Sequence, residues 1–518
     1  MPETTNLIGG NLEKYKREER PAENQIKSVA AAKRLKPIDR SQISWGAIDI
    51  EKLIEPDHPA RGIWAMVQQL DLRALEEKIR SVEGRAGQSS LDPRLLMSLW
   101  IYGYSEGISS ARELSRMCGY EPGCQWLTGM QEVNYHTLSD FRVEHKKELD
   151  RIFVQVLGLL SVEGLIEMKR ITQDGTKIKA HAASKSFRRG QRIRDHLQMA
   201  RKHVEAMSKP ETAELTTRMI EARKRASREK QQRLEEALQE LEQLQQTQDK
   251  DPEDIRVSET DPQARIMKQA NGGFAPSYNM QVSTDAANGL IVAVDVTQAG
   301  NDYEQLVPGL ERVKANTGQT PGQILVDGGY TLKYSNIETM AQQGVDLNGP
   351  VAETNSEASF RQRGISRKFY PDQFSYDGTT DTFTCPAGQS LKRAGMSRRD
   401  GGIEYRYQAL EIDCHTCPFH DQCCPKSSSR MIVRKENSPA VKAFQAKMQT
   451  TQAKQLYRTR AQIAEFPHAW IKEKLGVRQF RLKGLVKVGA EAVWVCLTYN
   501  IQQWLRLSWK PRFHAIAS

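Results

Sequence analysis

Two short segments decide the fold: ITQDGT (residues 171–176) and QILVDGGY (residues 323–330). Each has the β-branched, apolar residues of a buried strand, and each carries one carboxylate followed by glycine, a turn residue. The carboxylates are those of Asp174 and Asp327. We therefore expect two strands of one sheet, each ending in an acidic side chain.

The stretch between and after these segments predicts the rest of a mixed sheet. Alternating apolar residues predict strands at 277–282 and 290–294, and a helix is expected over 302–314. A second helix is predicted over 336–343, and a further strand over 345–351. Three meandering strands, a helix, a parallel strand and another helix predict an α/β fold, an RNase-H-like mixed sheet with flanking helices.

Helical patterns lie on both sides of this sheet. An all-α N-terminal domain is expected, with one helix starting at Asp92-Pro93, a second over 109–118, and a third capped by Thr137 and running to Leu160. Such short helices are compatible with a helix-turn-helix DNA reader and with any other compact helical domain. From Val441 to about Arg506 the chain is again predicted to be helical.

Two insertions interrupt the core. The first has apolar residues at helical spacing on both sides of Pro210, which predicts a helical hairpin that is polar outside; the second is rich in cysteine. The expected organisation is a flexible polar arm (1–45), a helical DNA-binding domain (46–165), a catalytic core (166–352 with 441–506), a helical insertion (185–257), a Cys-rich insertion (353–440) and a tail (507–518).

Composition narrows the class of protein. The 518 residues are 38% hydrophobic and 27% charged. They contain no apolar run of about 18 residues, so we expect no membrane span. The start of the chain lacks the apolar segment of a secretory signal, so a cytoplasmic location is expected.

The net charge is +11, and from Lys454 onward twelve Lys or Arg residues accompany three acids. A basic segment of this kind fits a polyphosphate partner, and equally a solubilising surface.

The cysteines indicate a second kind of site. Five of the eight lie between residues 385 and 424, a crowding that favours metal over disulfides in a chain without an export signal. One structural Zn²⁺ is predicted, held by four thiolates of this group: Cys385, Cys414, Cys417 and Cys423. Three neighbouring side chains are alternative ligands: Cys424, His415 and His420.

A third carboxylate, Glu465, belongs to a late predicted helix. Carboxylates from two strands and a helix make an oxygen-rich site suited to Mg²⁺ or Mn²⁺. Two such ions can activate a water or a 3′-hydroxyl and stabilise the leaving oxygen in phosphodiester chemistry. Tyr457, Arg460 and Lys472 flank this glutamate at offsets that, on a helix, place them broadly toward the side that carries Glu465.

The segment YRTRAQIAEFPHAWIKEKLGVRQFRLKGL (457–485) resembles the Tyr-Arg-Glu-Lys signature of bacterial insertion-sequence DDE transposases. ITQDGTKIKA and ILVDGGY resemble that family's first and second catalytic Asp motifs. HPARGIWAMVQQL and the stretch 91–120 resemble its helical N-terminal domain, and CHTCPFHDQCC its Cys-bearing segment. The resemblance extends from about His58 to Trp504. It departs from the usual signature by one extra residue between Arg460 and Glu465, and by Phe466-Pro467 after the glutamate.

The resemblance implies that Asp174, Asp327 and Glu465 are the catalytic metal ligands. It implies that Tyr457, Arg460 and Lys472 hold phosphates of the transposon end. The expected activity is cutting of transposon ends and joining of 3′-hydroxyls to target DNA, by a homodimer on double-stranded DNA in the bacterial nucleoid. Two alternatives stay open: a nuclease of the same fold without strand transfer, and a non-catalytic DNA-binding protein descended from a transposase.

Overall fold

The computed structural model describes residues 47–79, 81, 90–207, 217–247, 251–351, 357–400 and 402–512. The expected polar arm (1–45) and residues 513–518 of the tail lie outside this set. By its contacts the chain divides into Met1–Ile48 and Asp49–Ser518, and all helices and strands described below belong to the second unit.

The N-terminal part of that unit is helical. Its helices are α1 (Pro59–Gln68), α2 (Arg73–Glu76), α3 (Pro93–Ser105), α4 (Ala111–Met117), α5 (Pro122–Thr128), α6 (Tyr135–Glu144) and α7 (Lys146–Val162). Asp92 caps α3 as expected, accepting a hydrogen bond from the Arg94 backbone N–H at 2.7 Å. The single helix predicted from Thr137 to Leu160 is wrong: Asn134 caps α6, and His145 leaves helical geometry at ψ 37° before α7 begins.

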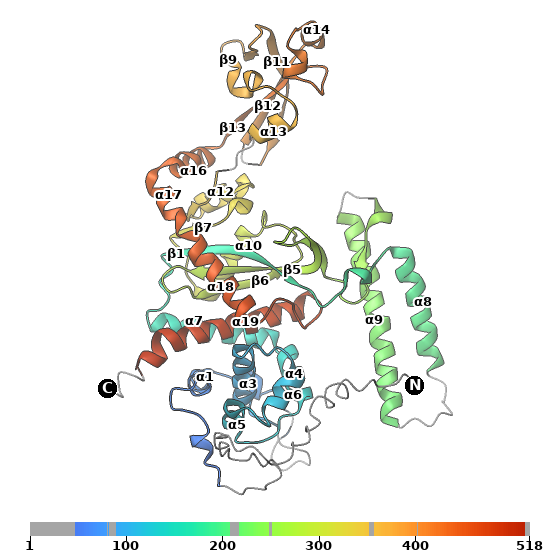
Figure 1. Cartoon of the computed structure of the whole chain (residues 1–518), viewed down its shortest axis with the longest axis vertical. Helices are drawn as coiled ribbons and strands as arrows, with labels where there is room; N and C mark the ends of the chain where they lie inside the picture. Colours follow the sequence, from blue (N-terminus) through green and yellow to red (C-terminus); the bar gives the residue numbers. More distant parts are fainter. Residues whose placement is uncertain are drawn as a thin grey trace, which may run out of the picture. The chain divides into compact units, whose positions relative to one another are not determined.

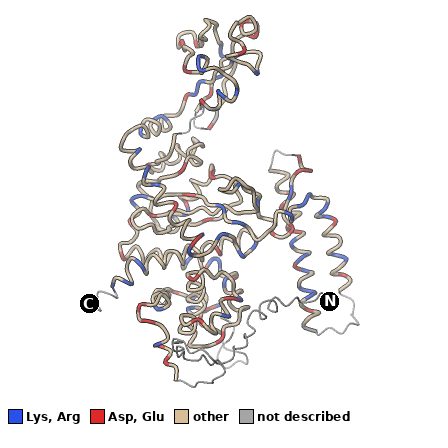
Figure 2. Tube along the Cα trace, viewed as in Figure 1, with Lys and Arg blue, Asp and Glu red and all other residues tan. Residues whose placement is uncertain are grey.

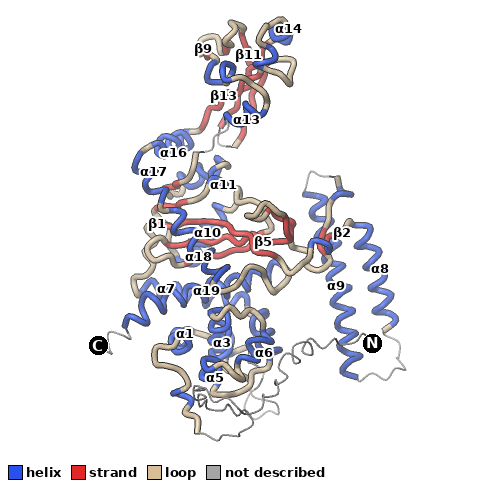
Figure 3. The backbone as a smooth tube through the Cα atoms, in the orientation of Figure 1, coloured by secondary structure: helices blue, strands red, loops and turns tan. Residues whose placement is uncertain are grey.

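A six-stranded mixed sheet follows (Figure 3). Its strands are β1 (Arg170–Lys179), β4 (Arg265–Lys268), β5 (Phe274–Asp285), β6 (Ile291–Thr297), β7 (Gln323–Leu325) and β8 (Asp346–Asn348). The strand β1 is antiparallel to β5 and parallel to β7, β5 also pairs with β4 and β6, and β7 is parallel to β8. The predicted meander and the parallel strand after it are thus present. The helices that follow β6 and β7 are α10 (Leu306–Thr317), α11 (Gly328–Thr331) and α12 (Tyr334–Gln342).

The C-terminal helices return to this sheet. They are α16 (Pro439–Gln449), α17 (Thr451–Arg458), α18 (Arg460–Glu473) and α19 (Leu485–Trp504), with a π-helical turn over Leu505–Trp509. The helix α18 packs on β1 and β5, while α19 contacts β6 on one side and α3 and α7 on the other (Figure 1). Fifteen of the twenty residues of α19 are buried, most of them apolar, as expected for a helix covered on both sides. One hydrophobic core therefore joins the sheet to the N-terminal helices.

Two further parts have cores of their own. The helices α8 (Gly190–Ala206) and α9 (Thr217–Thr247) pack through aliphatic side chains, and the short strands β2 (Phe187–Arg188) and β3 (Val257–Ser258) pair at their base. Basic and acidic residues both occur along the two helices (Figure 2).

The described residues of the cysteine-rich segment form a five-stranded antiparallel sheet with three small α-helices and two 3-10 turns. The elements are α13 (Glu357–Gln362), β9 (Ser375–Asp377), β10 (Thr382–Thr384), β11 (Ser390–Arg399), β12 (Gly402–Ala409), α14 (Glu411–His415), α15 (His420–Cys423) and β13 (Met431–Asn437). Among the described helices, none combines the length and the apolar character that a membrane crossing demands.

Candidate active site

Strand register brings Asp174 and Asp327 together. Thr172 on β1 lies opposite Leu325 on the parallel strand β7. Continuing that register by two residues places Asp174 opposite Asp327, where the chain leaves β7 and enters α11. Neighbouring strands lie about 4.8 Å apart, so the two carboxylates are close neighbours. Asp327 follows the end of β7 as expected, but Asp174 is the fifth of the ten residues of β1 and pairs with Val282 on β5, so the expectation that its strand ends there is wrong. The Asp327 side chain also accepts a hydrogen bond from the Gly329 N–H at 2.9 Å and so caps α11.

The Asp174 carboxylate is largely buried and contacts two residues of α18. Arg460 Nη2 lies 3.1 Å from Oδ1, and His468 Nε2 lies 3.8 Å from Oδ2. Burial raises the pKa of Asp174 to about 6, and the negative charge of Asp327 acts in the same direction, against the opposing effect of Arg460. A buried carboxyl with a raised pKa beside a second acid is typical of functional sites.

The helix α18 turns one face toward the sheet. Ala464, His468 and Ile471 are buried, at the spacing of a single helical stripe. Glu465 is one residue beyond this stripe and is exposed, and within the described chain it forms neither a hydrogen bond nor an ion pair. The structure therefore places Asp174 close to Asp327 but does not bring the Glu465 carboxylate into contact with either residue.

The three predicted phosphate-binding residues surround the aspartate pair. Lys472 Nζ donates a hydrogen bond to Thr176 Oγ1 on β1 at 2.5 Å, and burial lowers the pKa of the Lys472 ammonium. Tyr457 is half-buried at the end of α17; burial raises the pKa of its phenol, and the charges of Asp327 and Asp174 add to the rise. Arg460 is the cation that faces Asp174 directly.

Sequence reasoning missed two residues at this place, Asp302 and His468. The negative charge of Asp302 contributes to the raised pKa of Asp174. Burial lowers the pKa of His468 to about 3, helped by Lys472 and Arg460, so its imidazole is neutral. His468 lies two helical turns after Arg460, so a strict count of the stripe facing the sheet would have found it. Asp302 lies in the loop before α10, where no local signal marks it.

The residues present suit a hard divalent cation. All the acidic donors are carboxylate oxygens, the ligand type that Mg²⁺ and Mn²⁺ prefer. A Cβ at Gly175 would lie 2.3 Å from both Asp302 Oδ1 and Gln281 Nε2, so Asp302 lies on the face of β1 opposite to the Asp174 side chain. In the part of the chain that is described, no three His, Cys, Asp or Glu side chains stand ready to hold a metal ion. Three of these side chains would have to rotate in order to share one ion.

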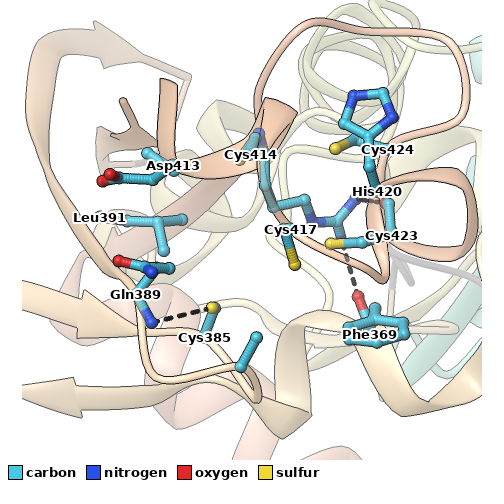
Figure 4. A pocket seen from close by; sticks show the side chains of 13 residues that line it. Phe369, Cys385, Gln389, Leu391, Asp413, Cys414, Cys417, His420, Cys423 and Cys424 are labelled. Carbon is cyan, nitrogen blue, oxygen red and sulfur yellow. Dashed lines mark hydrogen bonds between the residues drawn. The ribbon is translucent and has the colours of Figure 1, made fainter. Parts of the chain in front are cut away.

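The cysteine cluster is a separate candidate site. Five cysteines line one pocket with His420 and Asp413 (Figure 4): Cys385, Cys414, Cys417, Cys423 and Cys424. Of the alternative ligands, Cys424 and His420 thus line the pocket, whereas His415 does not. Here too, no three donor side chains of the described residues are placed to hold one metal ion. The thiols would therefore have to rotate to share an ion.

Backbone N–H groups donate hydrogen bonds to two of these sulfur atoms. Gln389 N–H donates to Cys385 Sγ at 3.2 Å, and Arg430 N–H donates to Cys414 Sγ at 3.4 Å. Burial raises the pKa of the Cys424 thiol to about 12, with Cys423 and Cys414 adding to the rise. Backbone donors of this kind stabilise and orient thiolate ligands.

Two family models match this chain. The model described as Transposase DDE domain matches residues 384–505, and the model described as Transposase domain (DUF772) matches residues 48–144. The first match includes Glu465 and the cysteine cluster but neither Asp174 nor Asp327. No curated protein matches the chain. The two matches support an insertion-sequence DDE transposase, an enzyme class that acts on DNA and generally uses Mg²⁺ or Mn²⁺.

Proposed function

We propose that this chain is the transposase of a bacterial insertion sequence, which cuts the transposon ends and joins their 3′-hydroxyls to target DNA. The observation that carries the proposal is the register of β1 and β7, which sets Asp174 beside Asp327, with α18 and its signature residues packed across β1. We assign the sheet and its helices to an RNase-H-like catalytic core, residues 166–352 with 441–506.

Within that core, Asp174, Asp327 and Glu465 would hold the divalent cations. Bound Mg²⁺ or Mn²⁺ supplies activation of the attacking oxygen and stabilisation of the leaving oxygen. Glu465 would reach the aspartates by rotation of its exposed side chain, when DNA covers this face. Arg460 would exchange its contact with Asp174 for a backbone phosphate, because a guanidinium binds phosphate in two-point geometry.

We propose a role for each of the remaining segments of the chain on the same basis. The helices of residues 46–165 would bind double-stranded DNA, and two copies of the chain would pair the transposon ends in a nucleoid-associated, cytoplasmic complex. The insertion at 185–257 would contact DNA or a partner without taking part in the chemistry. The Cys-rich insertion at 353–440 would bind one structural Zn²⁺ through Cys385, Cys414, Cys417 and Cys423.

The test is an end-cleavage assay on the full chain. Supercoiled DNA carrying the inverted repeats that flank this reading frame is incubated with protein and Mg²⁺, and nicked and joined products are separated by electrophoresis. We expect nicks with 3′-hydroxyl ends, then strand-transfer products, and neither with Asp327→Asn. Glu473→Gln is the matched control. Glu473 forms an exposed ion pair with Arg478 at the end of α18, so this variant should cut DNA like the wild type.

The same assay separates the alternatives. Metal-dependent nicks at the ends without any joined product would assign a nuclease and refute strand transfer. Binding to the ends without nicks, in both Mg²⁺ and Mn²⁺, would assign a non-catalytic DNA-binding protein and refute the proposal as a whole.

A further inference from the structure

The long helix α9 of the helical insertion carries its charges in two separate halves. Residues 219–233 contain six Lys or Arg residues and two acids, whereas residues 234–247 contain four Glu residues and no Lys or Arg. A helix whose charges serve only solubility and pairing typically mixes the two signs along its length. The two halves of α9 therefore differ in the partner that suits them.

The acidic half faces cations that the rest of the protein supplies. Glu235 pairs with Arg201 of α8 at 2.9 Å, and Glu240 pairs with Arg265 at the start of β4. A groove of about 660 Å³ lies between α9 and the start of α19, and acidic and basic side chains line it in equal number. These side chains are Glu229, Glu236, Glu240, Arg233, Lys483 and Lys487. Where α9 adjoins the core, its charge is therefore balanced.

The basic half has no such partners. Four of its six cations are exposed, and none of the six forms an ion pair with any residue that the structure describes. They are Arg223, Lys224, Arg225, Arg228, Lys230 and Arg233. Lys224 and Arg228 lie four residues apart, a spacing at which like charges destabilise a helix. A surface that keeps uncompensated cations together in this way suits a polyanion.

A groove across the hairpin adjoins these cations. It has a volume of about 620 Å³ and lies between α8 and α9. Lys230, Arg233 and His203 line it, and the one acid in its lining, Glu259, is bonded to His196 Nδ1 at 2.5 Å. A concave surface with cationic hydrogen-bond donors is suited to the phosphate oxygens of a nucleic-acid backbone.

We propose that the basic half of α9, residues 219–233, is a contact surface for the sugar-phosphate backbone of double-stranded DNA. The contact is independent of base sequence, because Lys and Arg at phosphates position the duplex without reading it. Arg223 lies about 25 Å along the helix from Glu240, which contacts the core, so the arm holds DNA away from that junction. The inference rests on the proposed function in taking DNA as the partner.

The experiment measures binding of the full chain to a fluorescein-labelled duplex that carries the inverted repeat, by anisotropy in EDTA at several NaCl concentrations. The variant Arg223→Gln/Arg225→Gln/Arg228→Gln removes three exposed cations. Each phosphate contact contributes about 0.9 to the slope of log K against log salt, so we expect the slope to decrease in magnitude by about 2–3. At 0.1 M NaCl the affinity should fall by about tenfold or more.

The matched control changes the net charge equally but removes cations that are already paired with an acid. It is Lys169→Gln/Arg312→Gln/Arg367→Gln, and the partners of these residues are Glu167, Asp295 and Asp372. Its salt slope should stay within about 0.5 of the wild-type value. An equal change in this control would show that net charge alone is responsible and would overturn the inference.

An unchanged slope in the triple arginine variant would also overturn it. If that variant does not fold, Lys230→Gln alone should reduce the slope by about 0.9, and an unchanged value would count equally against the inference. Altered self-association of the variant in analytical ultracentrifugation, with unaltered DNA binding, would assign the surface to a second copy of the chain and overturn the inference as well.

Failure of the proposed function gives a different result. A chain that binds duplex DNA through the basic half of α9, but neither nicks nor joins it, would refute the transposase and leave the DNA surface standing. A chain that nicks and joins DNA, while the triple arginine variant keeps the wild-type slope, would refute the DNA surface and leave the transposase standing.

Discussion

Asp174→Asn should make the metal-free protein more stable at neutral pH. The Asp174 carboxyl has a pKa of about 6 in the folded chain against an ordinary value of 3.8, because burial and the nearby charge of Asp327 outweigh its contact with Arg460. A carboxyl with a raised folded-state pKa contributes stability that is complete below pH 3.8 and is lost as the pH rises through about 6. Asparagine is the neutral counterpart of the protonated acid and can still accept from Arg460, so it avoids that loss.

The size of the effect follows from the two pKa values. A difference of about two pKa units corresponds to roughly 3 kcal/mol, so Asp174→Asn should raise the free energy of unfolding by about 2–3 kcal/mol at pH 7.5. At pH 5 the wild-type carboxyl is already mostly protonated in the folded state, and the gain should shrink to roughly half that figure.

Urea unfolding in EDTA at the two pH values, followed by tryptophan fluorescence, measures this gain. Asp295→Asn is the control: its carboxylate is about half exposed, so the substitution should change stability by less than about 0.5 kcal/mol at either pH. A metal-free Asp174→Asn protein that is less stable than wild type at pH 7.5 would show that the ion pair with Arg460 dominates. The conclusion that burial and the charge of Asp327 outweigh the contact with Arg460 would then be wrong.

Four further substitutions or measurements test other parts of the molecule. Glu465→Gln should reduce end cleavage by about 100-fold or more while DNA binding persists, and an equal loss in Glu473→Gln would show that the assignment along α18 is wrong. Purified protein should contain one zinc per chain by elemental analysis, lost when two of the pocket thiols are changed to serine; zinc-free folded protein would contradict this. Replacing residues 189–256 with a short turn between the paired strands β2 and β3 should leave Mg²⁺-dependent nicking measurable, and a folded deletion protein without nicking would count against an accessory role. Glu491→Ala should cost about 2–4 kcal/mol in thermal or urea unfolding, because its fully buried carboxylate accepts backbone N–H bonds from Arg481 and Leu482; a loss below about 1 kcal/mol would refute that role.

Local pattern was enough to predict five of the six strands of the sheet, but β4 was not predicted. The alternation and β-branched residues around Asp174 and the apolar run before Asp327 correspond to β1 and β7, and their parallel pairing follows from the helix between β6 and β7. The helix from Thr137 to Leu160 was predicted wrongly, because its break has no Gly or Pro to mark it. The break lies at His145, whose ring packs at 5.5 Å against Phe141 and whose Nδ1 lies 3.4 Å from Lys78 Nζ. Contacts between distant residues, which the local sequence does not contain, decide that boundary.

The surroundings of the aspartate pair depend on such contacts throughout. Motif spacing identifies Arg460, Glu465 and Lys472 as one group. Which of them contacts Asp174 depends on how α18 is rotated about its axis where it packs on the sheet. In the structure, Arg460 makes this contact. Asp302 has no motif of its own: its position is fixed by two amides on β5 and by the space left at Gly175 and Gly329. Each of these residues looks ordinary in the sequence, a strand amide or a turn glycine. Only the pairing of β1 with β5 brings these residues together, on the face of β1 opposite to the side chain of Asp174.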